Sequence, residues 1–284
     1  MEIGIGLPAT IPNVDGGLVL DWARRADRRG FSTVGTIDRL VYGNYEPLVA
    51  LAGAAAVTER IRLTTSVLLA PLRSNAALLA KQAASLDRLS GGRLVLGLSA
   101  GGREDDFEVG GVDFASRGRA FDGLVERVTA AWRGELGVGP APAAPDGPML
   151  VFGGQAPAAM RRMARYGAGW MSGGGGPDMF RNGAAAAKEA WAAAGRDGTP
   201  RLLSLGYYSL GPDAEGAADR YLHHYYEFLG PVADYIAAGA LTSPEQVRDA
   251  VGAFTEAGCD ELILFPCDQD PGQVDLLAEV ALGG

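Results

Sequence analysis

The sequence is poor in two residue types that carry much of enzyme chemistry, with two cysteines and two histidines among 284 residues. Cys259 and Cys267 flank the last apolar run, so a disulfide would have to span a strand, and we expect two free thiols. His223 and His224 are adjacent and would point about 100° apart on a helix, so they cannot both face one site. No His, Asp or Glu triplet has metal-ligand spacing, and the GxSxG elbow of serine hydrolases is absent. These absences argue against a metal site and a Ser-His-Asp hydrolase, and they favour chemistry carried by a bound cofactor.

Long apolar runs and an excess of positive charge are also missing. No stretch approaches the roughly 20 apolar residues that a membrane span needs. The first residues predict a strand and lack the basic and apolar regions of a signal peptide. A formal net charge of −9 would repel phosphates, which argues against a nucleic acid or an anionic membrane as partner. We therefore expect a cytoplasmic protein.

The sequence does contain a repeated pattern of short apolar runs rich in β-branched residues, each followed by a helix-like stretch and a polar or glycine-rich turn. The eight runs are residues 3–7, 33–37, 61–69, 93–99, 149–152, 168–172, 202–210 and 261–265. Such runs are typical of parallel strands buried on both faces, and their alternation with helices predicts a (β/α)8 TIM barrel. One barrel takes about 250 residues, so residues 1–284 are expected to form a single α/β domain.

The stretches between the runs predict helices at 17–29, 46–58, 75–89, 119–132, 157–166 and 177–194. In the third of these helices we expect one face to pack on the core, formed by Leu78, Leu79, Gln82, Leu86 and Leu89. Residues 134–148 are interpreted as a loop, and residues 211–241 as an insertion after the seventh strand. An insertion there is expected to shape a pocket, because TIM barrels keep their chemistry on the loops after the strands.

Glycine-rich turns follow two neighbouring strands and lead directly into helices. Gly153, Gly154 and Gln155 follow the fifth run, and Ser172 ends the sixth, with Gly173 and Gly174 directly after it. Backbone N–H groups at such turns, together with a helix N-terminus, can hold a phosphate, although glycines also simply make tight turns. Ser99, Ala100 and Gly101 form a third turn of small residues, which suits a large flat ligand across the barrel mouth.

Other strand ends carry polar residues. Asp38 and Arg39 end the second strand, where either a catalytic role or a salt bridge at the barrel rim is possible. Ser66 and Val67 offer one hydroxyl beside an apolar side chain in the third run. Residues 103–106 (REDD) are interpreted as a solvated charged loop.

Several of these stretches, taken in order and spacing, resemble the bacterial-luciferase-like flavin-dependent oxidoreductases over nearly the whole chain. They are residues 3–8 (IGIGLP), 30–39 (GFSTVGTIDR), 57–71 (VTERIRLTTSVLLAP), 79–97 (LAKQAASLDRLSGGRLVLG), 99–103, and 153–170 (GGQAPAAMRRMARYGAGW). The resemblance implies a barrel that binds reduced flavin mononucleotide (FMN) or, in a related branch, a deazaflavin coenzyme.

Site residues follow from the same resemblance. The ring would lie over the second to fourth strands, with a non-prolyl cis peptide between Ser66 and Val67, and Ser99–Gly101 along the ribityl chain. The turns after the fifth and sixth strands would hold the phosphate. Many deazaflavin-dependent members carry Asp-His where this chain has Asp38 and Arg39. A guanidinium cannot act as a general base, so histidine-assisted hydride transfer is in doubt, whereas Arg39 could stabilise developing negative charge or bind an acidic substrate.

The leading hypothesis is therefore a monooxygenase that uses reduced FMN from a separate flavin reductase, together with O2, on a small organic substrate. We also expect a homodimer. The alternatives are a deazaflavin-dependent reductase or dehydrogenase, and a flavin-binding protein without turnover. A largely apolar or aromatic substrate is expected, because the residues predicted to form the pocket wall are Leu7, Leu40, Tyr42, Tyr207, Tyr208, His223 and Tyr226.

Overall fold

The computed structural model describes residues 1–283, whose strands form one closed parallel barrel. The strands are β1 (Glu2–Gly6), β2 (Thr33–Thr36), β3 (Arg62–Thr65), β4 (Leu68–Leu69), β5 (Leu94–Ser99), β6 (Met149–Gly153), β7 (Gly169–Ser172), β8 (Arg201–Tyr208) and β9 (Glu261–Pro266). Their order is β3-β2-β1-β9-β8-β7-β6-β5-β4, and a further pairing of β3 with β5 closes the ring. The predicted TIM barrel is confirmed, because β3 and β4 are two parts of the third predicted strand.

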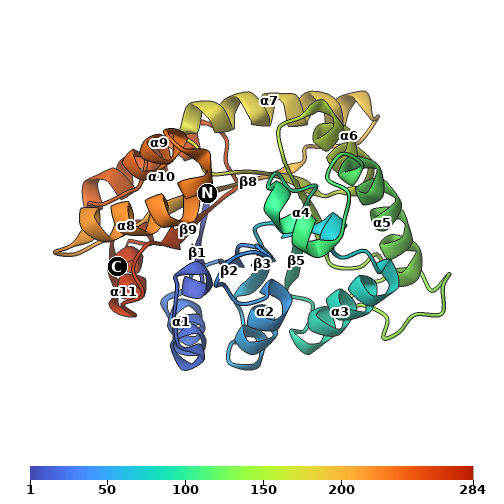
Figure 1. Ribbon diagram of the computed structural model, residues 1–284, viewed down its shortest axis with the longest axis horizontal. Helices are drawn as coiled ribbons and strands as arrows, with labels where there is room; N and C mark the ends of the chain where they lie inside the picture. Colours follow the sequence, from blue (N-terminus) through green and yellow to red (C-terminus); the bar gives the residue numbers. More distant parts are fainter. Residues whose placement is uncertain (284) are drawn as a thin grey trace.

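Helices surround the strands (Figure 1). They are α1 (Gly16–Arg29), α2 (Pro47–Ala56), α3 (Ala76–Leu89), α4 (Glu104–Gly110), α5 (Arg117–Trp132), α6 (Pro157–Tyr166), α7 (Pro177–Ala193), α8 (Ala214–Tyr226), α9 (Val232–Ala238), α10 (Pro244–Glu256) and α11 (Gly272–Ala281), with short 3-10 turns η1 (Pro8–Thr10), η2 (Ala70–Leu72) and η3 (Glu227–Leu229). Local signals set several of these ends. For example, a capping box of Ser243 and Gln246 opens α10.

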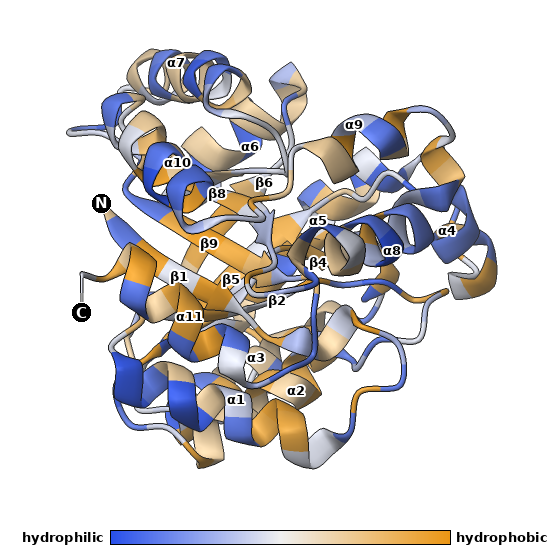
Figure 2. Cartoon of the chain, turned by 90° about the vertical axis from the view of Figure 1, so that its left-hand side faces the viewer, coloured by the Kyte–Doolittle hydropathy of each residue, from blue (hydrophilic) through white to orange (hydrophobic). Residues whose placement is uncertain are grey.

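Strand alternation divides the apolar side chains into two cores. Leu94, Leu96 and Leu98 of β5 pack in the layer between barrel and helices, whereas Val95 joins the barrel interior. The interior is filled from β5 to β9 by Val95, Val151, Met171, Leu203, Leu205, Tyr207, Ile263 and Phe265. Much of the sheet, β9 for example, is accordingly hydrophobic, whereas the outer helices carry many hydrophilic residues (Figure 2).

The predicted core face of α3 is wrong in part. Leu78 and Leu89 are 51% and 77% exposed, and Gln82 is also exposed. Leu79 and Leu86 are buried with the intervening alanines, and the Trp132 indole of α5 donates to the Ala80 carbonyl at 3.0 Å. The physical reason is that small side chains let α5 pack closely, so the alanine-rich face is buried and the leucines one position away are turned outward.

The insertion after the seventh predicted strand folds as α8, η3 and α9, and residues 133–148 form the expected loop. Both thiols, Cys259 and Cys267, are free and buried. Within residues 1–283, no helix is both long enough and apolar enough to cross a bilayer.

Closure of the barrel between β3 and β5 depends on Gly97. The Thr65 hydroxyl donates to the Gly97 carbonyl at 2.7 Å. A Cβ at position 97 would lie much closer to the Thr65 carbonyl oxygen than the 3.0 Å that real Cβ atoms keep. Because that oxygen belongs to the backbone, it cannot rotate away as a side chain can. Gly97 therefore sets the position of the strand end that leads into Ser66 and Val67.

We expect Gly97→Ala to lower the free energy of unfolding by about 1–3 kcal/mol, because the added methyl overpacks a backbone contact. The matched control is Gly123→Ala in α5, where a Cβ meets nothing within 4 Å. That change should raise the free energy of unfolding by up to about 1 kcal/mol, because alanine has a higher helix propensity than glycine. Urea unfolding of both variants tests the prediction, and equal stability of Gly97→Ala and the parent would contradict it.

Candidate active site

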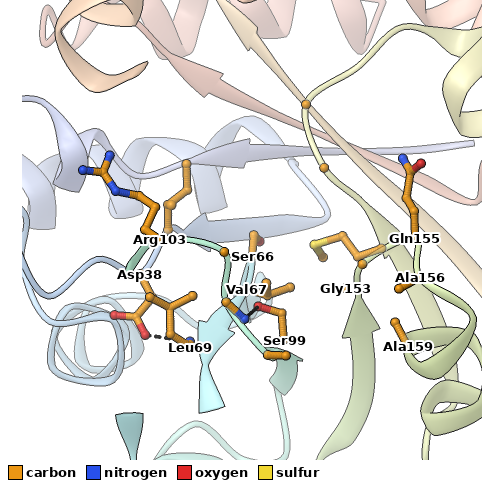
Figure 3. A pocket seen from close by; sticks show the side chains of 18 of the residues that line it. Asp38, Ser66, Val67, Leu69, Ser99, Arg103, Gly153, Gln155, Ala156 and Ala159 are labelled. Atoms are coloured by element: carbon orange, nitrogen blue, oxygen red, sulfur yellow. Dashed lines mark hydrogen bonds between the residues drawn. The ribbon is translucent and has the colours of Figure 1, made fainter. Parts of the chain in front are cut away.

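A cavity of about 640 Å³ opens at the carboxyl ends of the strands, where TIM barrels carry their active sites. Its volume lies within the range of roughly 300–1,000 Å³ typical of small-molecule sites. Every residue predicted to bind a cofactor lines it: Ser66, Val67, Ser99, Ala100, Gly101, Gly153, Gly154, Gln155, Ser172, Gly173 and Gly174. Figure 3 shows Ser66, Val67 and Ser99 between Asp38 on one side and Gly153 with Ala156 on the other.

One end of the cavity presents the N-terminus of α6, where Ala156, Ala158 and Ala159 line it. Ala156 caps this helix and supplies no side-chain acceptor for the first-turn N–H groups. The first residues of α7, Gly176 and Pro177, line a neighbouring cavity instead. Unsatisfied N–H groups and the positive ends of helix dipoles attract anions.

Two arginines at this end were not identified from the sequence. Arg117 lines the cavity, and its guanidinium donates to the carbonyls of Gly101 and Phe114 at 3.1 and 2.7 Å. Among the described residues, it has no carboxylate within ion-pair distance. Arg162 also lines the cavity but is held by Asp122 of α5 at 2.5 Å. Arg117 lies at the start of α5 and Arg162 midway along α6. No local sequence pattern marks them as cavity residues, because it is the packing of those helices that brings them to the cavity.

Asp38 lines the cavity with its carboxylate held on both oxygens. It accepts hydrogen bonds from the Leu69 backbone N–H at 2.8 Å and from Arg73 at 3.1 Å. Burial raises the pKa of this carboxyl, although the charge of Arg73 opposes the shift. Asp38 is thus fixed in place and more easily protonated than a surface aspartate.

Arg39 forms a salt bridge at the barrel rim, which is one of the two roles that the sequence left open. Its side chain is 4% exposed and pairs with Asp106 at 2.7 Å and Asp105 at 3.2 Å. The prediction that residues 103–106 form a solvated charged loop is wrong. Arg103 caps α4, the next three residues form its first turn, and Asp106 is fully buried. Asp106 also accepts from the backbone N–H groups of Leu40 and Val41. Arg39 lines the cavity nevertheless, and its Nη1 has no hydrogen-bond partner among the described residues.

The peptide bond between Ser66 and Val67 is cis, as the family resemblance predicts. The Oγ atoms of Ser66 and Ser172 are buried and lack hydrogen-bond partners within the described part of the chain. Because buried polar atoms normally find a partner, these two hydroxyls are suited to a polar ligand in the cavity that both residues line.

The other end of the cavity is aromatic. Tyr207 of β8 packs against Tyr226 of the α8 insertion, and Tyr226 in turn packs against Tyr225 and against Phe228 of η3, all of which line the cavity. The guanidinium of Arg103 lies over the Phe228 ring at 3.6 Å, which ties η3 to the start of α4. Phe228 and Arg103 were not predicted as pocket residues.

Five predicted wall residues do not line this cavity. Tyr208 follows the inward Tyr207 and therefore points outward, where its hydroxyl donates to the Gln273 carbonyl at 3.2 Å. Leu7 is buried in the layer between barrel and helices. Leu40 is 46% exposed on the outside. Tyr42 bonds His224 in an adjoining hollow that shares Phe228 with the cavity, and His223 faces a polar hollow beside Asp234.

These features define a TIM-barrel protein whose mouth has an anion-attracting end and an aromatic end. Residues 1–258 match the family model described as luciferase-like monooxygenase. The chain belongs to this family.

Two relatives show the range of descriptions among proteins of similar sequence. An uncharacterised protein of Mycobacterium tuberculosis (strain ATCC 25618 / H37Rv) is 36% identical over 209 residues, which cover 60% of this chain and 71% of that protein. The F420-dependent glucose-6-phosphate dehydrogenase of Kineococcus radiotolerans is 35% identical over 130 residues, which cover 44% of this chain and 38% of that protein.

Solved structures share the fold. Monooxygenase RslO1 from Streptomyces bottropensis superposes with a TM-score of 0.79 at 23% identity, covering 99% of each chain. An F420-dependent secondary alcohol dehydrogenase, in complex with an F420-acetone adduct, gives a TM-score of 0.81 at 20% identity, covering 98% of this chain and 97% of that one. A monooxygenase and an F420-dependent dehydrogenase thus share this architecture.

We expect Arg39→Met to destabilise the protein by about 3–5 kcal/mol, because it leaves the buried Asp106 carboxylate without its cation. Adding Asp106→Asn removes that charge while keeping an oxygen for the Leu40 and Val41 N–H groups, so the double variant should recover much of the loss. The exposed Arg24→Met is the control, expected within about 0.5 kcal/mol of the parent. Urea unfolding measures all three, and a double variant no more stable than Arg39→Met alone would refute the pairing.

Proposed function

We propose that this protein is a flavin-dependent monooxygenase that uses reduced FMN and O2 on a small organic substrate. The observation that carries the proposal is the polarity of one continuous cavity. Its anion-attracting end, with Arg117 and the N-terminus of α6, suits a phosphate, and its aromatic end suits an apolar substrate.

The residues present fit this cofactor. The phosphate would be held by the two glycine turns, with Arg117 and Arg162 nearby; the turns consist of Gly153, Gly154, Gln155, Ser172, Gly173 and Gly174. The rest of the cofactor would lie along Ser66, Val67, Ser99, Ala100 and Gly101. The unpartnered hydroxyls of Ser66 and Ser172 support this assignment, since a ligand with many acceptors would satisfy them. Reduced flavin supplies the electrons that activate oxygen.

The chain's own residues would bind, orient and exclude water. Tyr225, Tyr226 and Phe228 cover the cavity with apolar surface, which keeps water from a reactive centre. Asp38 and Arg39 are proposed as the catalytic residues, with the Nη1 donor of Arg39 stabilising developing negative charge. The net effect of Arg39 is limited because Asp105 and Asp106 offset its charge.

The proposal also covers the protein's partners, its oligomeric state and its location in the cell. Because the cofactor would be used in its reduced form, a separate flavin reductase would supply it, and we propose a cytoplasmic homodimer. Light scattering after size exclusion tests the oligomeric state.

A second candidate is a deazaflavin-dependent dehydrogenase or reductase, in which hydride moves without oxygen. Asp38 favours it, because a buried carboxyl with a raised pKa beside the cavity can exchange a proton with a substrate. The similarity to an F420-dependent dehydrogenase supports the same candidate.

We expect Gly173→Val to weaken FMN binding by about ten-fold or more without destabilising the fold. A Cβ at position 173 meets no protein atom within 4 Å and would enter the cavity. The control is Gly43→Val, at an exposed glycine that likewise has nothing within 4 Å. Fluorescence titration with FMN measures affinity, and thermal unfolding checks each fold.

Parallel titrations decide between the cofactors. Tighter binding of FMN than of riboflavin, which lacks the phosphate, would support the phosphate end, and Arg117→Gln should reduce that preference. Stronger binding of the deazaflavin than of FMN would favour the second candidate. FMN affinity that Gly173→Val leaves unchanged would remove the glycine turns from the site.

A further inference from the structure

Two tyrosine hydroxyls meet at the aromatic end of the cavity. The Oη atoms of Tyr207 and Tyr226 lie 2.6 Å apart, and both residues line the cavity. Tyr207 points into the barrel from β8, whereas Tyr226 is the last residue of α8 in the insertion. Their rings stand nearly perpendicular, at 80°, so the hydroxyls meet edge to edge without stacking of the rings.

Counting protons shows that this pair has one donor to spare. Each phenol carries one proton, and the bond between the two oxygens uses one of the two. Among the described residues, neither hydroxyl bonds any other group. One O–H therefore remains to donate to a third oxygen. Burial raises the pKa of both phenols, so both stay protonated near neutral pH.

The surrounding charges favour a neutral acceptor. The cations nearest this end, Arg39 and Arg103, share the carboxylates of Asp105 and Asp106, so the group of four carries no net charge. The neighbouring wall is apolar or aromatic, formed by Met171, Leu205, Tyr225 and Phe228. An anion placed here would lose its hydration without gaining an uncompensated cation, whereas a neutral oxygen loses little.

We propose that Tyr207 and Tyr226 act as a donor pair that binds the carbonyl oxygen of an apolar carbonyl compound and orients it in the cavity. This inference rests on the proposed function, because it takes the cavity to be the active site and names its substrate class. A carbonyl needs only a donor from the protein, and the pair provides one.

Other tyrosines of the insertion provide controls. Tyr221 lies on the same helix, but its hydroxyl bonds Thr10 at 2.7 Å and it does not line the cavity. Tyr225 lines the cavity but does not belong to the pair. Substitution by phenylalanine at either position removes the hydroxyl group and leaves the shape of the ring nearly unchanged.

The test uses two probes of similar shape, acetophenone and ethylbenzene, which differ by the carbonyl oxygen. Ligand-observed NMR on the full chain measures both affinities, and infrared spectra of carbonyl-labelled acetophenone report hydrogen bonding as a lowered stretching frequency. In the double variant Tyr207→Phe/Tyr226→Phe, acetophenone should bind about 2–13-fold more weakly, the equivalent of one neutral hydrogen bond. Ethylbenzene affinity should stay the same, and the lowered frequency should be lost.

Tyr221→Phe and Tyr225→Phe should keep the preference for acetophenone. Thermal unfolding verifies that the double variant folds. Equal affinity of the parent for the two probes, no acetophenone binding, or loss of the preference in Tyr225→Phe alone would overturn the inference. Anaerobic titration of the same samples with reduced FMN separates the two proposals: failure to bind reduced FMN rejects the cofactor assignment, whereas binding of reduced FMN without ketone preference rejects only the donor pair.

Discussion

The closed barrel imposes the constraint on which the rest of this structure depends. Once β3 pairs with β5, each strand must send alternate side chains into the interior and into the layer under the helices. The carbonyl of Thr65 can approach β5 only because residue 97 lacks a side chain. That one contact fixes the end of β3, and with it the position of Ser66 and Val67 at the centre of the cavity floor.

Local sequence patterns predicted much of this arrangement. Apolar runs identified the strands, and glycine turns before helices identified the residues at the anion-attracting end, since both signals are read within a few residues. The pocket wall was predicted less well, because choosing between Tyr207 and Tyr208 requires the direction in which each strand residue points. Arg117, Arg162 and Phe228 come from helices and a turn whose packing no local pattern describes.

Charge is distributed unevenly along the cavity. Arg117 has no carboxylate partner among the described residues, whereas Arg39 is offset by two carboxylates of α4. A buried ion pair with good geometry holds neighbouring segments in register at little net gain in stability. Here Asp106 binds the Arg39 side chain and two following backbone N–H groups, so the pair shapes the loop after β2 more than it attracts an anion.

The two ends of the cavity are built by different parts of the chain. The anion-attracting end uses turns and a helix start that belong to the repeating barrel, so its geometry is fixed by the fold. The aromatic end depends on α8 and η3, which follow β8: α8 packs on the barrel interior through Tyr221, Leu222 and Tyr225, and Arg103 lies over Phe228 of η3. Tyr207 connects the two parts, since it points into the barrel interior from β8 and its hydroxyl bonds Tyr226 of the insertion. A change in the insertion could therefore alter which molecules the cavity accepts while the barrel keeps the opposite end unchanged, which is how one fold can serve several chemistries.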